Sequence, residues 1–163
     1  MWELIIDGAI DGKSNMEALE RWVEPTQVVL DIGTGSGILA IASRLLGARE
    51  VFGCDIDPVA VEVARANIVR NAENEIWTFC GSANAIRTSS VHLVLCNMTA
   101  DLITELLSEI DRVLRPQGIA IFSGILREQH EELSEVIARH RFTVHEELTR
   151  GEWVALIAEK HVA

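Results

Sequence analysis

Three glycines alternate with other residues directly after a short apolar run. They are Gly33, Gly35 and Gly37. The run before them, residues 28–32, is rich in Val, Leu and Ile and has the length of a strand. Glycine lets a backbone turn tightly and approach a ligand closely, and a helix predicted over 38–46 would add free N–H groups there. The stretch therefore predicts a strand, a glycine loop and a helix that bind a polar cofactor, although the glycines could instead only permit the turn.

Polar side chains stand at the ends of two further predicted strands. Asp55 closes the strand over 50–55, and Asn97 follows the strand over 91–96. In an open parallel α/β sheet the carboxyl ends of the strands form one edge, where ligands bind. There Asp55 could accept hydrogen bonds from two ribose hydroxyls, and Asn97, which can both donate and accept, could contact the reacting group. Either residue could instead serve only as a helix cap.

The spacing of the glycines bears on the choice of cofactor. A dinucleotide-binding loop has the pattern G-x-G-x-x-G, and here Ile38 stands where the third glycine of that pattern would fall. The spacing therefore disfavours NAD without excluding it. Asp31, the penultimate residue of the first strand, is expected to act near the loop, although a buried carboxylate there could also bond only to backbone amides.

Alternating strand and helix patterns must position these side chains. Ser14 and Glu17 have capping-box spacing and predict a helix that Pro25 ends. Asp57, followed by proline, predicts the start of another helix. Such alternation indicates a mostly parallel sheet covered on both faces, here closed by an antiparallel hairpin. The expected strands are 28–32, 50–55, 76–80, 91–96, 119–123 and the hairpin 142–147 with 153–159; the expected helices are 14–23, 38–46, 57–70, 102–114 and 126–140.

The length and composition set the class of protein. The chain has 163 residues, of which 48% are hydrophobic and 24% are charged, so it is long enough to bury one core of sheet and helices. We expect a single domain over 1–163, in which a leader over 1–13 precedes an N-terminal helix over 14–24. The remainder, 27–163, is predicted to form a doubly wound, Rossmann-like α/β core.

The charge of the chain is strongly acidic. The formal net charge is −11 at pH 7. Binding of a nucleic-acid backbone depends on clustered Lys and Arg, so the charge disfavours nucleic acid as a partner and favours a basic peptide or a small molecule. The acidic balance could also be a solubility feature alone.

Three cysteines fall in predicted strands and are expected to be buried reduced thiols: Cys54, Cys80 and Cys96. Their number is odd and no pair has metal-ligand spacing, so we expect neither disulfides nor a metal site. The chain has no apolar run long enough to span a bilayer and no basic region followed by an apolar stretch of signal length. These features predict a cytoplasmic protein without a membrane partner.

Several motifs resemble those of one known family. The loop Asp31–Gly37 resembles motif I of class I S-adenosylmethionine-dependent methyltransferases. More specific stretches are similar to the catalytic domain of the ribosomal protein L11 methyltransferase family (PrmA type), from about Glu17 to Glu159. These stretches are Leu30–Ala42, Gly53–Pro58, Asn97 at a helix start, Leu114–Gly118, Ser123–Leu126 and Gly151–Trp153.

The resemblance implies a class I methyltransferase fold with S-adenosyl-L-methionine as the cofactor. Asp55 would contact its ribose, Ile56 would pack against its adenine, and Asn97 would contact the cofactor and act in catalysis. Ser82 stands where the family has an acidic residue near the adenine. The family methylates α-amino and lysine groups of its ribosomal substrate, so N-methylation of protein amino groups is the expected reaction. The cofactor-binding residues expected in all are Asp31, Gly33, Thr34, Gly35, Gly37, Asp55, Ile56, Ser82 and Asn97.

Two features depart from the family. The family has a separate amino-terminal domain that holds its substrate, and this chain is expected to start too late to contain one, so a partner protein could supply recognition. The family's Gly-Thr-Gly-x-His-x-Thr-Thr segment over the cofactor aligns with residues 7–14, where its cofactor-contacting threonine falls on about Gly12. A non-catalytic S-adenosylmethionine-binding module, a methyltransferase for a small molecule or RNA, and a nucleotide-dependent oxidoreductase therefore stay open as alternatives.

Overall fold

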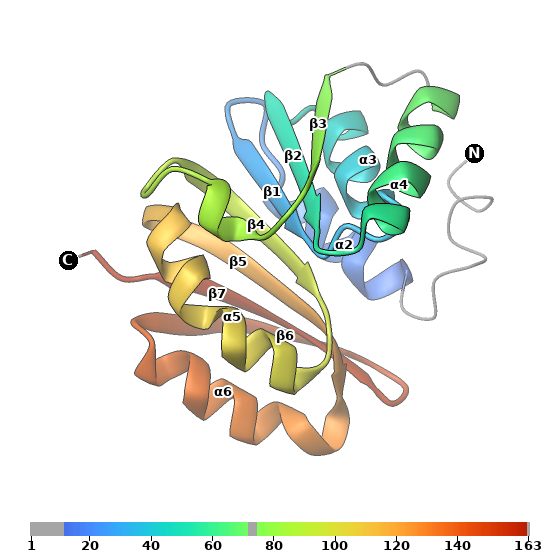
Figure 1. The fold of residues 1–163 in the computed structure, drawn as a ribbon. Helices are drawn as coiled ribbons and strands as arrows, with labels where there is room; N and C mark the ends of the chain where they lie inside the picture. The colour runs from blue at the N-terminus through green and yellow to red at the C-terminus, as the bar shows by residue number, and fades with distance from the viewer. Residues whose placement is uncertain (1–11, 72–74, 163) are drawn as a thin grey trace.

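The chain folds around a seven-stranded sheet in the computed structural model, which describes residues 12–71 and 75–162 (Figure 1). The strand order is β3-β2-β1-β4-β5-β7-β6. The strands are β1 (Val28–Ile32), β2 (Glu50–Asp55), β3 (Ile76–Cys80), β4 (Val91–Asn97), β5 (Leu114–Leu126), β6 (Phe142–Arg150) and β7 (Trp153–Lys160). The helices are α2 (Gly12–Trp22), α3 (Ile38–Leu45), α4 (Pro58–Arg70), α5 (Ala100–Val113) and α6 (His130–Arg139), with short 3-10 turns η1 (Ala83–Ala85) and η2 (Arg127–Gln129).

The strand order reverses next to β1. Strand β1 lies between β2 and β4 and is parallel to both. Strands β3 and β5 continue the parallel arrangement, whereas β7 is antiparallel to β5 and β6. After β3 the chain returns to the other side of β1 to form β4, and in such sheets ligands bind outside the carboxyl ends of the strands at this reversal. The fold thereby places the glycine loop, Asp55 and Asn97 at one edge.

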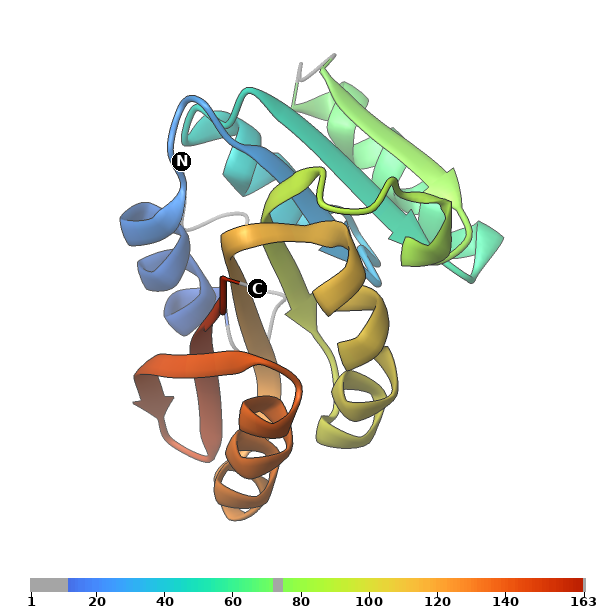
Figure 2. The same ribbon diagram turned by 90° about the vertical axis from the view of Figure 1, so that its left-hand side faces the viewer.

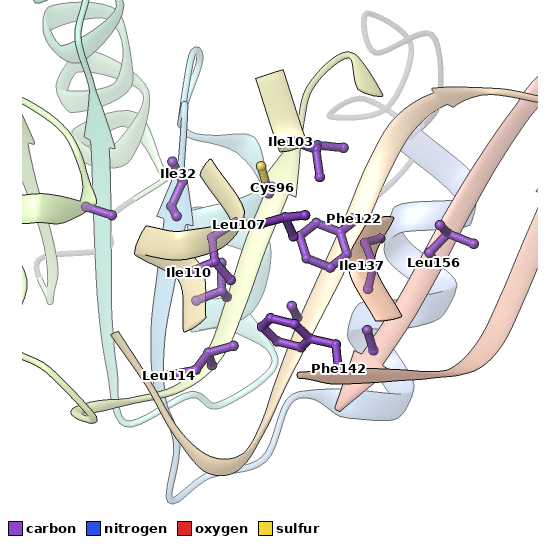
Figure 3. Packing of buried hydrophobic residues seen from close by; sticks show 14 of the residues in the cluster. Ile32, Cys96, Ile103, Leu107, Ile110, Leu114, Phe122, Ile137, Phe142 and Leu156 are labelled. Atoms are coloured by element: carbon purple, nitrogen blue, oxygen red, sulfur yellow. The ribbon is translucent and has the colours of Figure 1, made fainter. Parts of the chain in front are cut away.

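Helices cover both faces of the sheet. Helices α2, α3 and α4 lie on one face, with core residues such as Leu19, Ile41 and Ile68. Helices α5 and α6 lie on the other face, where Leu107 and Ile137 pack against the strands (Figure 3). Figure 2 shows α2 and α5 on opposite sides of the central strands. The core therefore consists of two apolar layers separated by the sheet.

Helix α5 illustrates how the sequence produces these layers. Ile103, Leu107 and Ile110 recur at three- and four-residue spacing and are fully buried, whereas Leu102 is 46% exposed. Such periodicity gives a helix one apolar stripe that packs against a sheet. The helix has 14 residues. None of the helices in the described part of the chain is long and apolar enough to cross a membrane.

The expected α/β fold is confirmed, but strand β5 is longer than expected. It begins at Leu114 rather than at residue 119. Val91 of β4 pairs with Leu114, and Leu93, two residues later, pairs with Ile119. The residues between these pairs, 115–118, are therefore accommodated as a bulge within the strand. The expected turn at these residues is a local irregularity and does not separate α5 from β5.

Three helix starts also differ from the expectation, and one of them is α5, which begins at Ala100 rather than at residue 102. Helix α2 begins at Gly12, two residues before the expected cap at Ser14. Helix α6 begins at His130, because the 3-10 turn η2 precedes it. Residues 1–11 lie outside the described residues, and with them most of the expected leader and of the segment aligned with the family's cofactor-covering motif.

The expectation of three buried thiols is wrong for one cysteine. All three cysteines are free; Cys54 and Cys96 are buried, whereas Cys80 is exposed. Cys80 ends β3, which is an edge strand with a neighbour on one side only, so its side chain has less protein around it. Burial raises the pKa of the Cys54 and Cys96 thiols to about 12.

A substitution at Phe122 tests the apolar layer between the sheet and helices α5 and α6. Its ring is fully buried and meets the Phe142 ring edge-on, with the centroids 6.3 Å apart (Figure 3). Phe122→Ala should lower the free energy of unfolding by about 3–5 kcal/mol. The variant buries less apolar surface on folding, and it also leaves a cavity in the core. Urea unfolding measures this change. Val69→Ala, at a side chain that is 73% exposed, should change it by less than about 0.5 kcal/mol; equal losses would contradict the core position of Phe122.

Candidate functional site

The carboxyl ends of β1 and β2 are joined by hydrogen bonds from the glycine loop. The amides of Gly33 and Thr34 both donate to the Cys54 carbonyl oxygen, at 2.8 and 3.0 Å. The Gly35 amide donates to Asp55 Oδ2 at 3.0 Å. The loop that follows β1 is therefore held directly beside the carboxylate that ends β2.

Asp31 lies buried beneath this loop. The residue is 1% exposed. Its Oδ2 accepts hydrogen bonds from the Thr34 hydroxyl at 2.6 Å and from the Ala40 amide at 3.2 Å. Thr34 is buried as well. Both side chains point into the protein, where they tie together the end of β1, the loop and the first turn of α3.

Burial changes the acidity of Asp31. Desolvation raises the pKa of this carboxyl to about 7, although the hydrogen bonds from Thr34 and Ala40 lower it. The nearby Asp55 carboxylate raises the pKa further. Asp31 therefore titrates near neutral pH, well above an ordinary aspartate.

Gly33 permits a close approach between the loop and the end of β4. The three loop glycines have positive φ, and that of Gly33 is 67°. A Cβ at this position would lie 1.9 Å from Met98 Cε. The Met98 side chain therefore lies on the loop backbone at Gly33. This contact joins the segment after β4 to the segment after β1.

The segment after β2 divides its roles between neighbouring residues. Asp55 Oδ1 accepts a hydrogen bond from the Asp57 amide at 3.0 Å, and Asp57 caps α4 by accepting one from the Val59 amide at 2.9 Å. The cap of α4 is therefore Asp57, as predicted, and Asp55 faces the loop. Between them Ile56 is 80% exposed. This side chain presents an apolar surface beside a carboxylate, as small-molecule sites do.

Ser82 lies on the same side of the edge as Asp55. The Gly81 amide donates to the Asp55 carbonyl oxygen at 2.8 Å, which brings the end of β3 to the end of β2. The Ser82 side chain is half-buried and makes no capping bond to η1. Its hydroxyl is therefore not used in capping that turn.

Asn97 is exposed at the carboxyl end of β4, beside Ser123 of β5. The Met98 amide donates to the Ser123 carbonyl oxygen at 2.9 Å. Gly124, with φ of 77°, then passes so close that a Cβ there would lie 2.6 Å from Asn97 Oδ1. The backbone of Gly124 thus lies against Asn97 Oδ1. Thr99 is the N-cap residue of α5, so Asn97 is not the cap.

Asn15 of α2 adds a polar group beneath this pair. The residue is 4% exposed, and its buried Oδ1 has no hydrogen-bond partner within the described residues. It lines a small void with Leu95, Ile121 and Ser123. Because side chains alternate along a strand, Leu95 lies on the same face of β4 as Asn97. An unpaired amide oxygen therefore lies directly under the edge that carries Asn97.

The structure separates the nine predicted cofactor residues into two groups. Six are at least partly accessible, namely Gly33, Gly35, Asp55, Ile56, Ser82 and Asn97, whereas Asp31, Thr34 and Gly37 are buried. Sequence reasoning missed Asn15, Met98 and the contact of Gly124 with Asn97. The stretch Ser123–Leu126 already carried a signal for Gly124, but no local pattern marked Asn15.

The raised pKa of Asp31 gives a pH-dependent prediction. Its folded-state pKa of about 7 lies above the unfolded value of about 3.9. The folded state therefore binds more protons between these values, and this contribution to stability is lost as the pH rises through the window. Asp31→Asn keeps an oxygen acceptor for Thr34 and Ala40 but does not titrate. The free energy of unfolding of the variant minus that of the wild type should rise across the window by on the order of 1 kcal/mol per pH unit.

Urea unfolding of both proteins at several pH values within this window measures the difference. Taking the difference cancels the titration of the other carboxyl groups, which the two proteins share. A difference that does not depend on pH would contradict the raised pKa.

Comparison with known proteins finds relatives that are named as methyltransferases. The ribosomal protein L11 methyltransferase of Anoxybacillus flavithermus is 38% identical over 146 residues, which cover 89% of this chain and 47% of that protein. The protein of the same name from Carboxydothermus hydrogenoformans is 40% identical over 146 residues, or 89% of this chain and 48% of that protein. The chain thus spans about half the length of the curated relatives it matches.

A solved structure and a family model agree with these relatives. The crystal structure of ribosomal protein L11 methylase from Lactobacillus delbrueckii subsp. bulgaricus superposes with a TM-score of 0.85 at 30% identity, covering 90% of this chain and 77% of that one. The family model described as ribosomal protein L11 methyltransferase (PrmA) matches residues 12–161. Since that match includes the glycine loop, Asp55, Asn97 and both stretches around Gly124 and Gly151, the chain belongs to the ribosomal protein L11 methyltransferase (PrmA) family.

Proposed function

We propose that this chain is an S-adenosylmethionine-dependent methyltransferase that methylates amino groups of a protein. The observation that carries the proposal is the meeting of the glycine loop, Asp55 and Asn97 at one edge of the sheet, in a chain of the PrmA family. The curated relatives are named for a ribosomal protein. A ribosomal protein is therefore the first substrate to test.

The residues at this edge fit S-adenosylmethionine. Each carboxylate oxygen of Asp55 accepts a hydrogen bond from one backbone amide. A carboxylate has about four lone-pair sites, so Asp55 can still accept hydrogen bonds from ribose hydroxyls. The exposed Ile56 offers an apolar surface to the adenine, with Ser82 on the same side. The loop backbone at Gly33 and Gly35 is partly accessible beside them. When bound, the cofactor supplies a methyl group on a sulfonium, which needs no further activation.

The chain's own residues must deliver a neutral amine to the methyl group. A free lysine amine has a pKa of about 10.4 and is protonated at neutral pH. Desolvation at the edge lowers that pKa, and Asn97 Oδ1, which lies against Gly124, accepts a hydrogen bond from the amine and orients it. Asn97 is thus the proposed catalytic residue. Placement of the amine in line with the bond that breaks is the main contribution of the protein.

Substrate recognition forms a second part of the proposal. The chain spans about half the length of its curated relatives. The proposal includes a partner protein that holds the methyl-accepting protein. The expected location is the cytoplasm, which the three free cysteines support.

Asp55 tests the cofactor site. Asp55→Ala should weaken binding of S-adenosylmethionine by roughly 1–3 kcal/mol, because hydrogen bonds to a charged group are lost. Isothermal titration calorimetry measures the affinity. The matched control is Asp57→Ala, which removes a neighbouring carboxylate that caps α4 and should lower stability with little change in affinity. Wild-type protein that binds NAD but not S-adenosylmethionine would contradict the proposal and favour an oxidoreductase.

Gly124 tests the role of Asn97 in transfer. Gly124→Ala should slow methyl transfer by about 10- to 100-fold, because the new Cβ would displace Asn97 Oδ1. Transfer of a labelled methyl group to proteins of a ribosomal extract measures the rate. Gly151→Ala is the control, since Gly151 also has a positive φ, of 60°, but nothing lies within 4 Å of its added Cβ.

The two glycine variants share the strain of a left-handed backbone. The Cβ of Gly124→Ala would in addition meet Asn97 Oδ1 and the Met98 backbone, so this variant should lose more stability and also transfer more slowly. Equal transfer rates would contradict the role of Asn97. A wild-type chain that binds the cofactor and transfers no label to protein, RNA or small molecules would favour a non-catalytic module.

A further inference from the structure

A groove separates helices α5 and α6 and encloses about 520 Å³. Its lining comes from the first two turns of each helix and includes Asp101, Thr104, Glu105, Glu132, Leu133 and Val136. Leu133 is buried and Val136 is half-buried, so the groove has an apolar floor. The three carboxylates are on exposed residues. We refer to this feature as the acidic groove.

The three carboxylates of the acidic groove are uncompensated. Within residues 12–71 and 75–162, no hydrogen bond or ion pair engages any of them. On the same two helices Glu109 pairs with Arg112, and Glu135 pairs with Arg139. Glu109 and Glu135, which lie outside the groove, thus have basic partners one turn away, whereas the three groove carboxylates, like Glu131 outside it, have none among the described residues.

Helix dipoles account for only part of this charge. Asp101 and Glu132 lie in the first turns of their helices, where a carboxylate stabilises the N-terminus. Glu105 lies one turn further along α5, where that effect has faded. Its position is therefore not accounted for by the helix dipole.

The acidic groove opens at the edge that carries Asn97. Helix α5 begins at Ala100, three residues after Asn97, and Ala100 also lines the groove. Helix α6 follows β5, whose Gly124 lies against Asn97. Figure 1 shows the two helices side by side, both starting at this end of the sheet. From Thr99 to Glu105 the helix rises about 9 Å, a length that about three residues of extended peptide would span.

We infer that the acidic groove binds a Lys- or Arg-bearing segment of the methyl-accepting protein, with a basic residue about three positions from the methylated one. This inference rests on the proposed function and adds the surface that selects the substrate. The apolar floor receives the methylene stem of the basic side chain, and the carboxylates receive its charged head. A polyanion such as RNA is repelled by the same three charges.

The test compares two triple variants with the same change in net charge. The groove variant is Asp101→Asn, Glu105→Gln and Glu132→Gln. The control variant is Glu20→Gln, Glu24→Gln and Glu62→Gln, at exposed residues on α2, after α2 and on α4. The probe is a short fluorescent peptide of alanine and glycine with one central lysine and an arginine three positions to each side. Fluorescence anisotropy measures its binding to the whole chain.

The groove variant should bind this peptide about tenfold more weakly, since exposed ion pairs contribute little each. The control variant should change binding less than about twofold, and both should bind S-adenosylmethionine as the wild type does. Equal weakening in the two variants or no change in either would overturn the inference. So would a wild-type chain that binds an oligoribonucleotide of the same length more tightly than it binds the peptide. Circular dichroism spectra of both variants should match that of the wild type, which checks that they are folded.

The same samples separate this inference from the proposed function. Normal methyl transfer with peptide binding that does not depend on the groove carboxylates would overturn the groove and leave the methyltransferase. Groove-dependent peptide binding in a chain that transfers no methyl group would overturn the proposed function, and with it the assignment of the groove to a substrate.

Discussion

The buried carboxylate of Asp31 holds the candidate site in shape. A carboxylate removed from water loses much of its solvation, and here that loss appears as a pKa raised to about 7. Hydrogen bonds from Thr34 and Ala40 offset part of the loss. One donor belongs to the glycine loop and the other to α3, so both bonds can form only in one arrangement of the loop. The position of Gly35 against Asp55 depends on that arrangement.

Two close backbone approaches extend this order from β1 to the other side of the edge. Met98 lies on Gly33, and Gly124 lies against Asn97. Both glycines have positive φ. A Cβ on Gly33 would meet the end of the flexible Met98 side chain, whereas a Cβ on Gly124 would meet Asn97 Oδ1 and the Met98 backbone. The place where an amine would meet a methyl donor is therefore shaped by glycine backbone packed against the side chains of Met98 and Asn97.

Part of the acidic charge of the chain lies beside the same edge. The net charge is −11. Glu109 and Glu135 on α5 and α6 pair with neighbouring arginines, while the three carboxylates of the acidic groove have no partner among the described residues. The unpaired oxygen of Asn15 lies beneath Asn97 in the same region. The Asn15 oxygen and the groove carboxylates are thus polar groups near the proposed site of transfer that a substrate could satisfy.

The sequence by itself determined the features that a few neighbouring residues encode. The alternation of strands and helices, the glycine loop and the cap at Asp57 all follow from local periodicity and turn chemistry, and the family motifs identified the relatives. Only the tertiary structure decided that Asp31 points inward, that Cys80 is exposed on an edge strand, and that Asn97 rests against Gly124. These outcomes depend on which strands become neighbours and on which face each helix covers. Such contacts join residues far apart in the chain, so no local pattern contains them.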